Sequence, residues 1–267
     1  MLAADSVERT RQAERLAAAV RQAGELALSK FRTPLKSWTK GRYSPVCEAD
    51  IASNELLRER LYGADGDVGW LSEESLDDPT RLQARRIWVV DPIDGTRAYI
   101  EGRPDWSISA ALVEDGRPVA AAIFAPVKNE MFLAVAGRGA TLNGSPIAAS
   151  TGGLDAACIA GPAGYLRRLQ AIDGSFVAHP KVHSLALRFA RVAQGAIDAA
   201  FASGNSHDWD LAAADLLVHE AGGALTSFTG QLLIYNQTNP VHAPLVAAGR
   251  DRHAALIDLV RSQQITS

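Results

Sequence analysis

The middle of the sequence reads Ile87-Trp88-Val89-Val90-Asp91-Pro92-Ile93-Asp94-Gly95-Thr96. Its first four residues form a short apolar run, which is typical of a strand that is buried on both faces. A proline and a glycine bend the backbone after this run, so the carboxylates of Asp91 and Asp94 can converge with the Ile93 carbonyl. Carboxylate and carbonyl oxygens are the ligands that Mg²⁺ prefers. An Asp-rich turn is also a common structural feature, so this stretch alone leaves both interpretations open.

Acidic residues in three other segments stand where a predicted strand stops or a predicted helix starts. Glu73 and Glu74 follow the apolar pair Trp70-Leu71, which could end a strand. Asp50 and Asp210 stand at the starts of two predicted helices. Each segment also has a structural explanation, either as a solvated acidic surface or as a helix N-cap. The acidic segments are therefore informative only as a group.

The rest of the chain alternates between predicted helices and strands, and from about residue 150 this pattern is typical of an α/β fold. The predicted helices are 7–31, 50–61, 185–194, 211–221 and 252–263. The predicted strands are 87–90, 107–113, 118–124, 131–135, 140–142 and 245–248. A surface loop is predicted at 35–45 and a turn at 63–69. We therefore predict an α/β (α+β) protein with an N-terminal α+β half at residues 1–150 and a C-terminal α/β half at residues 151–267.

Composition and charge exclude several classes of protein. The chain has 267 residues, of which 47% are hydrophobic, so it can form a sizeable core and does not resemble a disordered chain. Its 27 Lys and Arg residues against 30 Asp and Glu residues give a net charge of −3, which does not suggest a nucleic-acid or membrane partner. The two cysteines, Cys47 and Cys158, form neither a disulfide framework nor a zinc motif. We therefore predict a cytoplasmic protein.

Taken together, the acidic segments resemble the inositol monophosphatase superfamily of metal-dependent, lithium-sensitive phosphatases. Three motifs carry the resemblance and occur in the same order: Glu73-Glu74, then Asp91-Pro92-Ile93-Asp94-Gly95-Thr96, then Trp209-Asp210-Leu211-Ala212-Ala213 leading to Glu220-Ala221-Gly222-Gly223. The resemblance extends from about residue 40 to residue 249. It implies a layered αβαβα sandwich of the inositol monophosphatase and fructose-1,6-bisphosphatase type, with the metal site between the two halves.

The resemblance also implies roles for individual residues. The implied metal ligands, for two or three Mg²⁺ ions, are Glu73, Asp91, the Ile93 carbonyl, Asp94 and Asp210. Thr96 and Asp50 would orient and activate the attacking water, and Glu73 would act partly through water. The amides of Gly95 and Thr96 would hold the phosphate. Lys40, in a loop that closes over the metals in related enzymes, is either a phosphate-facing residue or a solvated loop lysine. Cys47 stands where the family usually has threonine, and we interpret it as a small buried residue rather than a nucleophile.

The choice of substrate is less determined than the chemistry. Inositol monophosphatases place an acidic residue that contacts the inositol hydroxyls a few positions before the Trp-Asp motif; here Ser203 falls at that position, and residues 202–207 contain no carboxylate. The segments 44–50, 71–74 and 125–129 instead favour the 3′(2′),5′-bisphosphate nucleotidase branch, which converts 3′-phosphoadenosine 5′-phosphate to AMP and phosphate. A second phosphate would need a basic residue, and the candidates are Arg167, Arg168, Lys181 and Arg188.

Several alternatives stay open at this point. The substrate can also be inositol 1-phosphate, a sugar phosphate or histidinol phosphate, because relatives hydrolyse all of these. A non-catalytic regulatory binding protein is a more remote possibility, since no expected metal ligand is missing. Many relatives form dimers, so a homodimer is possible.

Overall fold

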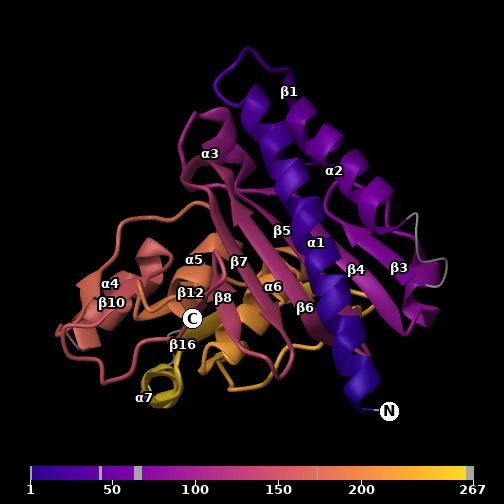
Figure 1. The fold of residues 1–267 in the computed structure, drawn as a ribbon. Coiled ribbons are helices and arrows are strands. Elements are labelled where there is room, and N and C mark those ends of the chain that lie inside the picture. The colour runs from indigo at the N-terminus through magenta and orange to yellow at the C-terminus, as the bar shows by residue number, and fades with distance from the viewer. Residues whose placement is uncertain (1, 42–43, 63–67, 173, 263–267) are drawn as a thin grey trace.

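The computed structural model describes residues 2–41, 44–62, 68–172 and 174–262, and it contains two large β-sheets (Figure 1). The first sheet has seven strands in the order β3 (Val68–Ser72), β4 (Arg86–Asp94), β5 (Ser107–Glu114), β6 (Arg117–Ala125), β7 (Glu130–Val135), β8 (Ala140–Leu142) and β9 (Ser145–Ile147). The pair β3–β4 is parallel and the other neighbours are antiparallel. This sheet therefore follows chain order, and after β5 its strands are joined by short connections.

The second sheet is formed by the C-terminal half of the chain. Its strand order is β11 (Val177–Ala178), β10 (Cys158–Ala160), β12 (Ala199–Ala202), β16 (Leu245–Gly249) and β14 (Gly223–Ser227). Two small antiparallel ribbons complete the strands: β1 (Ser37–Lys40) pairs with β2 (Ser44–Cys47), and β13 (Ser206–His207) pairs with β15 (Val241–His242).

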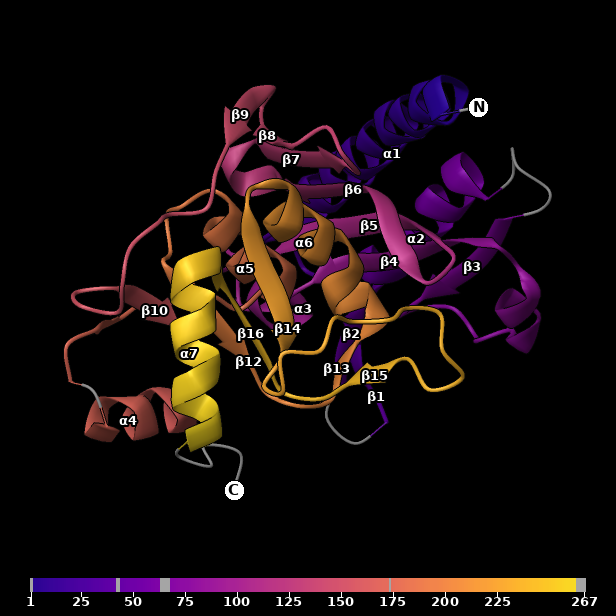
Figure 2. The same cartoon turned by 90° about the horizontal axis from the view of Figure 1, so that it is seen from below.

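Helices cover both sheets and fill the space between them (Figures 1 and 2). The helices are α1 (Leu2–Lys30) and α2 (Glu48–Leu61) on the outer face of the first sheet, α5 (Leu185–Ala193) and α6 (Asp208–Glu220) between the sheets, and α4 (Ala163–Ile172) and α7 (Arg250–Ser262) on the outer face of the second. A short helix, α3 (Thr96–Ile100), follows β4, and 3₁₀ turns occur at η1 (Pro79–Gln83) and η2 (Pro126–Lys128). The predicted αβαβα sandwich is thus confirmed.

The apolar run that opens β4 is buried on both faces, as predicted. Ile87 and Val89 belong to the core shared with α5 and α6, whereas Trp88 and Val90 belong to the core shared with α1 and α2. Successive side chains of a strand point to opposite faces, so a continuous apolar run packs against the helical layers on both sides of the sheet.

Some details of the sequence-based prediction were wrong. The predicted loop at 35–45 contains the ribbon β1–β2, whose first strand is exposed along its whole length, so no apolar alternation marks it in the sequence. The strand predicted at 87–90 continues through Asp94. Most of the predicted turn at 63–69 lies outside the described residues, and its last two residues begin β3.

The division at residue 150 stays a prediction. The two large sheets lie on either side of it, but α6 from the second half packs against strands of the first sheet. Within the described part of the chain, no helix combines the length and apolar character needed to cross a membrane.

Candidate active site

Three buried or half-buried carboxylates converge between the two sheets. Oxygen atoms of Asp91, Asp94 and Asp210 all lie within 4.8 Å of one another. Asp91 and Asp94 come from the end of β4, and Asp210 comes from the first turn of α6. The structure thus brings together three predicted metal ligands from both halves of the chain.

A β-bulge explains why two aspartates three residues apart can share one face of the sheet. In a regular strand, such residues point to opposite faces. Here Asp91 pairs with Ser109 and Asp94 pairs with Ser107, so three steps along β4 match two steps along β5. The extra residue restores the common direction of the two carboxylates, toward the layer that contains α6.

Asp94 is held in place by the start of α5. Its carboxylate accepts hydrogen bonds from the Ser184 hydroxyl, from Leu185 N (3.2 Å) and from Ala186 N (2.7 Å). Ser184 is the N-cap of α5, and its hydroxyl lies 2.9 Å from that of Ser107. The sequence analysis did not identify Ser184 as a site residue. A serine directly before an alanine-rich helix is an N-cap signal, but nothing in it indicates a partner on β4.

Asp50 and Asp210 occupy the same local position in their helices. Each is the third residue of its helix and accepts a hydrogen bond from the backbone N–H of the residue before the helix: Cys47 N at 2.8 Å and His207 N at 2.6 Å. The alternative interpretation as N-caps is therefore wrong; both aspartates are the acidic member of a capping-box arrangement. This arrangement fixes the orientation of each carboxylate while leaving its second oxygen for other partners.

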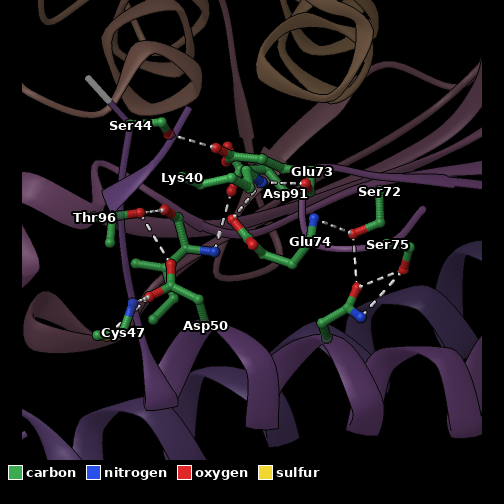
Figure 3. Close-up of polar contacts among 12 residues, drawn as sticks. Lys40, Ser44, Cys47, Asp50, Ser72, Glu73, Glu74, Ser75, Asp91 and Thr96 are labelled. Carbon is green, nitrogen blue, oxygen red and sulfur yellow. Dashed lines mark hydrogen bonds and ion pairs between the residues drawn. The ribbon is translucent and has the colours of Figure 1, made fainter. Parts of the chain in front are cut away.

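The predicted pair Thr96 and Asp50 is in contact (Figure 3). The Thr96 hydroxyl lies 2.9 Å from Asp50 Oδ1 and 2.9 Å from the Ile93 carbonyl oxygen. Cys47 is fully buried, and its thiol donates to Asp50 at 2.8 Å. Burial, followed by the charge of Asp50, raises the pKa of the Cys47 thiol to about 12, which removes it as a nucleophile.

Lys40 and Ser44 place the ribbon β1–β2 against the acidic pair at the end of β3 (Figure 3). Lys40 Nζ donates to the Glu73 carbonyl at 2.5 Å and lies 3.1 Å from Glu74 Oε1. The Ser44 hydroxyl donates to Glu73 Oε1 at 3.3 Å. Lys40 thus faces the site although its side chain is 44% exposed, and Glu73 lies beside the three-aspartate cluster rather than within it.

The structure gives less support for the remaining residues that were predicted to bind substrate. Gly95 has a left-handed backbone (φ +92°), and a Cβ atom there would lie 3.2 Å from Ser184 N, so only glycine fits well. Ser203 is exposed in the turn after β12. Arg188 donates to the carbonyls of Phe201 and Val182, which gives its guanidinium a structural role. Lys181 lines a separate cleft of about 560 Å³, and Arg167 and Arg168 lie on α4 in the outer layer.

Burial and mutual repulsion make the carboxylates resist ionisation. Burial raises the pKa of Asp50 to about 6, and burial together with the neighbouring Glu74 raises the pKa of Glu73 to about 7. Burial followed by neighbouring carboxylates raises the pKa of both Asp91 and Asp210 well above the ordinary value. A cluster of convergent oxygens with this excess of negative charge fits one or more divalent cations, and its oxygen-only donors suit Mg²⁺.

We expect Mg²⁺ to raise the melting temperature of the protein more at about pH 8 than at about pH 5. Asp50 and Glu73 have higher pKa values in the folded protein than in the unfolded chain. The metal-free folded protein therefore binds more protons and loses stability as the pH rises from about 4 to about 7. Mg²⁺ binds the ionised carboxylates and offsets this loss only where they are ionised. Calorimetric melting with and without Mg²⁺ at both pH values tests this, and equal shifts would contradict it.

Comparison with known proteins places this site in a family. A model of the inositol monophosphatase family matches residues 8–264. The protein named Nus factor SuhB from Xylella fastidiosa is 36% identical over 229 residues, which cover 79% of this chain and 80% of that protein. The inositol-1-monophosphatase of Rhizobium meliloti is 30% identical over 238 residues, which cover 85% of this chain and 86% of that protein.

A solved structure supports the same assignment. The extragenic suppressor protein suhB from Bartonella henselae superposes with a TM-score of 0.83 at 27% sequence identity, over 92% of this chain and 96% of that one. The match to the family model includes every residue of the carboxylate cluster. The chain therefore belongs to the inositol monophosphatase family, whose members are Mg²⁺-dependent phosphatases.

Proposed function

We propose that this chain hydrolyses small phosphomonoesters at the Asp91–Asp94–Asp210 cluster, with two or three Mg²⁺ ions held by these residues, Glu73 and the Ile93 carbonyl. The observation that carries the proposal is the convergence of the three carboxylates from both halves of the chain within 4.8 Å. Bound Mg²⁺ would neutralise the phosphoryl oxygens and lower the pKa of a water molecule.

The chain's own residues supply the orientation of the nucleophile. Asp50 is fixed by Cys47 N and accepts a hydrogen bond from the Thr96 hydroxyl, so a lone pair of the Thr96 oxygen is left to accept a hydrogen bond from the attacking water. The water oxygen bonds to phosphorus while one of its protons passes through the Thr96 hydroxyl to Asp50, and the ester P–O bond breaks. The leaving alkoxide takes a proton from solvent, and Asp50 returns its proton to solvent. Lys40, directed at the acidic pair, would contribute a positive charge beside the phosphate.

For the substrate, we propose 3′-phosphoadenosine 5′-phosphate in preference to inositol 1-phosphate. The segment around Ser203 lacks the carboxylate that would accept polyol hydroxyls. Asp208, the first acid after Ser203 in the sequence, is fully buried and accepts hydrogen bonds from His242 and Asn236, so it cannot replace the missing group. The names of the relatives do not support the nucleotidase branch and make inositol 1-phosphate the second candidate.

Side-by-side kinetics test this preference. We expect kcat/KM for 3′-phosphoadenosine 5′-phosphate to exceed that for inositol 1-phosphate by about tenfold, or about 1.4 kcal/mol, because each poorly paired hydroxyl costs roughly 1 to 3 kcal/mol. Ser203→Glu should raise kcat/KM for inositol 1-phosphate several-fold, whereas Ser145→Glu, which adds the same charge on exposed β9, should not. Equal or reversed efficiencies in the wild-type protein would favour the inositol or sugar-phosphate substrate and leave the metal chemistry untouched.

A regulatory role without catalysis is the contrasting possibility. It is considered because several relatives carry the name Nus factor. The presence of every expected metal ligand supports catalysis. Phosphate release from a panel of phosphomonoesters, with Mg²⁺ present, separates the two possibilities.

A further inference from the structure

An irregular segment between β14 and β15, residues 233–237, links the first half of the chain to α6; we call it the strap. The loop that contains it extends from the end of β14 toward the segments around β3 (Figure 2). Arg117 donates to the Leu233 carbonyl at 2.6 Å, and Tyr235 N donates to the Gly116 carbonyl at 3.0 Å. The Tyr235 hydroxyl donates to Asp215 of α6 at 3.0 Å. The strap is thus anchored on both sides.

A buried arginine forms the strongest of these links. The Arg81 side chain, on η1, is only 1% exposed, and it forms a two-point ion pair with Asp77 at 2.5 and 2.9 Å. It also donates to Asn236 Oδ1 at 2.7 Å and to the Gln237 carbonyl at 3.2 Å, while Asn236 Nδ2 returns a hydrogen bond to the Arg81 carbonyl at 3.1 Å. A buried guanidinium needs all of these partners, and its planar geometry fixes their relative positions.

The strap also contacts the start of α6, so the position of Arg81 is linked to that helix. Asn236 N donates to Asp208 Oδ2 at 2.8 Å, and His242 Nε2 lies 2.7 Å from Asp208 Oδ1. Asp208 is fully buried and stands two residues before the cluster member Asp210. At the other end of the network, Asp77 follows Glu73 by four residues.

We propose that Arg81 and Asn236 are positioning residues that hold the Glu73 segment and the Asp210 segment at the spacing that divalent cations require. The three carboxylates of the cluster come from two elements, so any separation of α6 from the end of β4 would move Asp210 away from Asp91 and Asp94. The Asp77–Arg81–Asn236–Asp208 network opposes the separation without contacting the metal site itself. It therefore strengthens metal binding by keeping the ligands pre-organised. This inference rests on the proposed metal role of the cluster.

Calorimetric titration with Mn²⁺ alone tests the inference, and two variants weaken the network. Arg81→Met removes the guanidinium. Asn236→Gly removes the amide but keeps the backbone N–H that contacts Asp208, and glycine tolerates the positive φ of +58° at this position. We expect each variant to raise the Kd for Mn²⁺ by about tenfold, which is about 1.4 kcal/mol. At saturating Mg²⁺, kcat should stay within about twofold of wild type, because the ligands themselves are unchanged.

Two matched variants act as controls. Arg252 is another buried arginine, and it donates hydrogen bonds to the carbonyls of Gly153, Ser150 and Thr151, which lie outside the strap. Asn143 is another left-handed asparagine with two side-chain hydrogen bonds. Arg252→Met and Asn143→Gly should lower the melting temperature but leave the Mn²⁺ affinity within about twofold of wild type.

The outcomes distinguish failure of the positioning role from failure of the proposed metal site. Unchanged Mn²⁺ affinity in folded Arg81→Met and Asn236→Gly, or an equal loss in the control variants, would overturn the positioning role. Failure of the wild-type protein to bind Mn²⁺ would overturn the proposed metal site, and with it this inference.

Discussion

The Asp94→Asn variant is expected to lose at least about a hundredfold in kcat/KM for any phosphomonoester that the wild-type protein hydrolyses, while it stays folded. Asp94 is one of three converging carboxylates, and the amide removes one negative charge from the group that must hold clustered cations. The fold should survive because asparagine has the same shape and its carbonyl can still accept hydrogen bonds from Ser184 and Ala186. Loss of the charge also relieves repulsion in the metal-free protein.

Phosphate release and melting temperature, measured on the same preparation, check this prediction. Asp198→Asn is the matched control, because Asp198, directly before β12, is also a hydrogen-bonded carboxylate with contacts to Ser150, Cys158 N and Arg252. The control should lose stability but keep its activity. Near wild-type turnover in Asp94→Asn at ordinary Mg²⁺ would show that Asp94 is not a ligand.

The sequence was sufficient to predict the parts of the fold that have a strong apolar pattern. The β-branched apolar run at 87–90 was predicted as a buried strand, and the alanine-rich helices around 185–194 and 211–221 were marked by their apolar period. The ribbon β1–β2 was missed because β1 is exposed along its whole length, and the contacts of Lys40 and Ser44 are made with a distant segment. Such contacts leave no local pattern.

The candidate site was predictable as a set of residues but not as an arrangement. Motifs identified the three aspartates, yet the bulge that turns Asp91 and Asp94 to one face depends on register with β5. Likewise, Ser184 and Arg81 act through partners that are 90 and 155 residues away in the chain. The substrate preference inferred from Ser203 stays a prediction, because it depends on the effect of a single missing carboxylate on polyol recognition.

Removal of divalent cations is expected to abolish turnover. A phosphate monoester dianion is repelled by the uncompensated carboxylates of Asp91, Asp94 and Asp210, so neither binding nor attack is favourable without cations. The Thr96–Asp50 pair would orient water in the proposed mechanism, but it cannot neutralise the phosphoryl oxygens. We expect less than about 1% of the activity to remain after chelation, since metal ions supply several kcal/mol of transition-state stabilisation.

The most direct test of the metal-dependent mechanism is therefore phosphate release after treatment with EDTA, followed by addition of excess Mg²⁺ to the same sample. Melting curves recorded in parallel establish that the chelated protein is still folded. We expect loss of phosphate release in EDTA and full recovery with Mg²⁺. Undiminished phosphate release from the chelated, folded protein would contradict it.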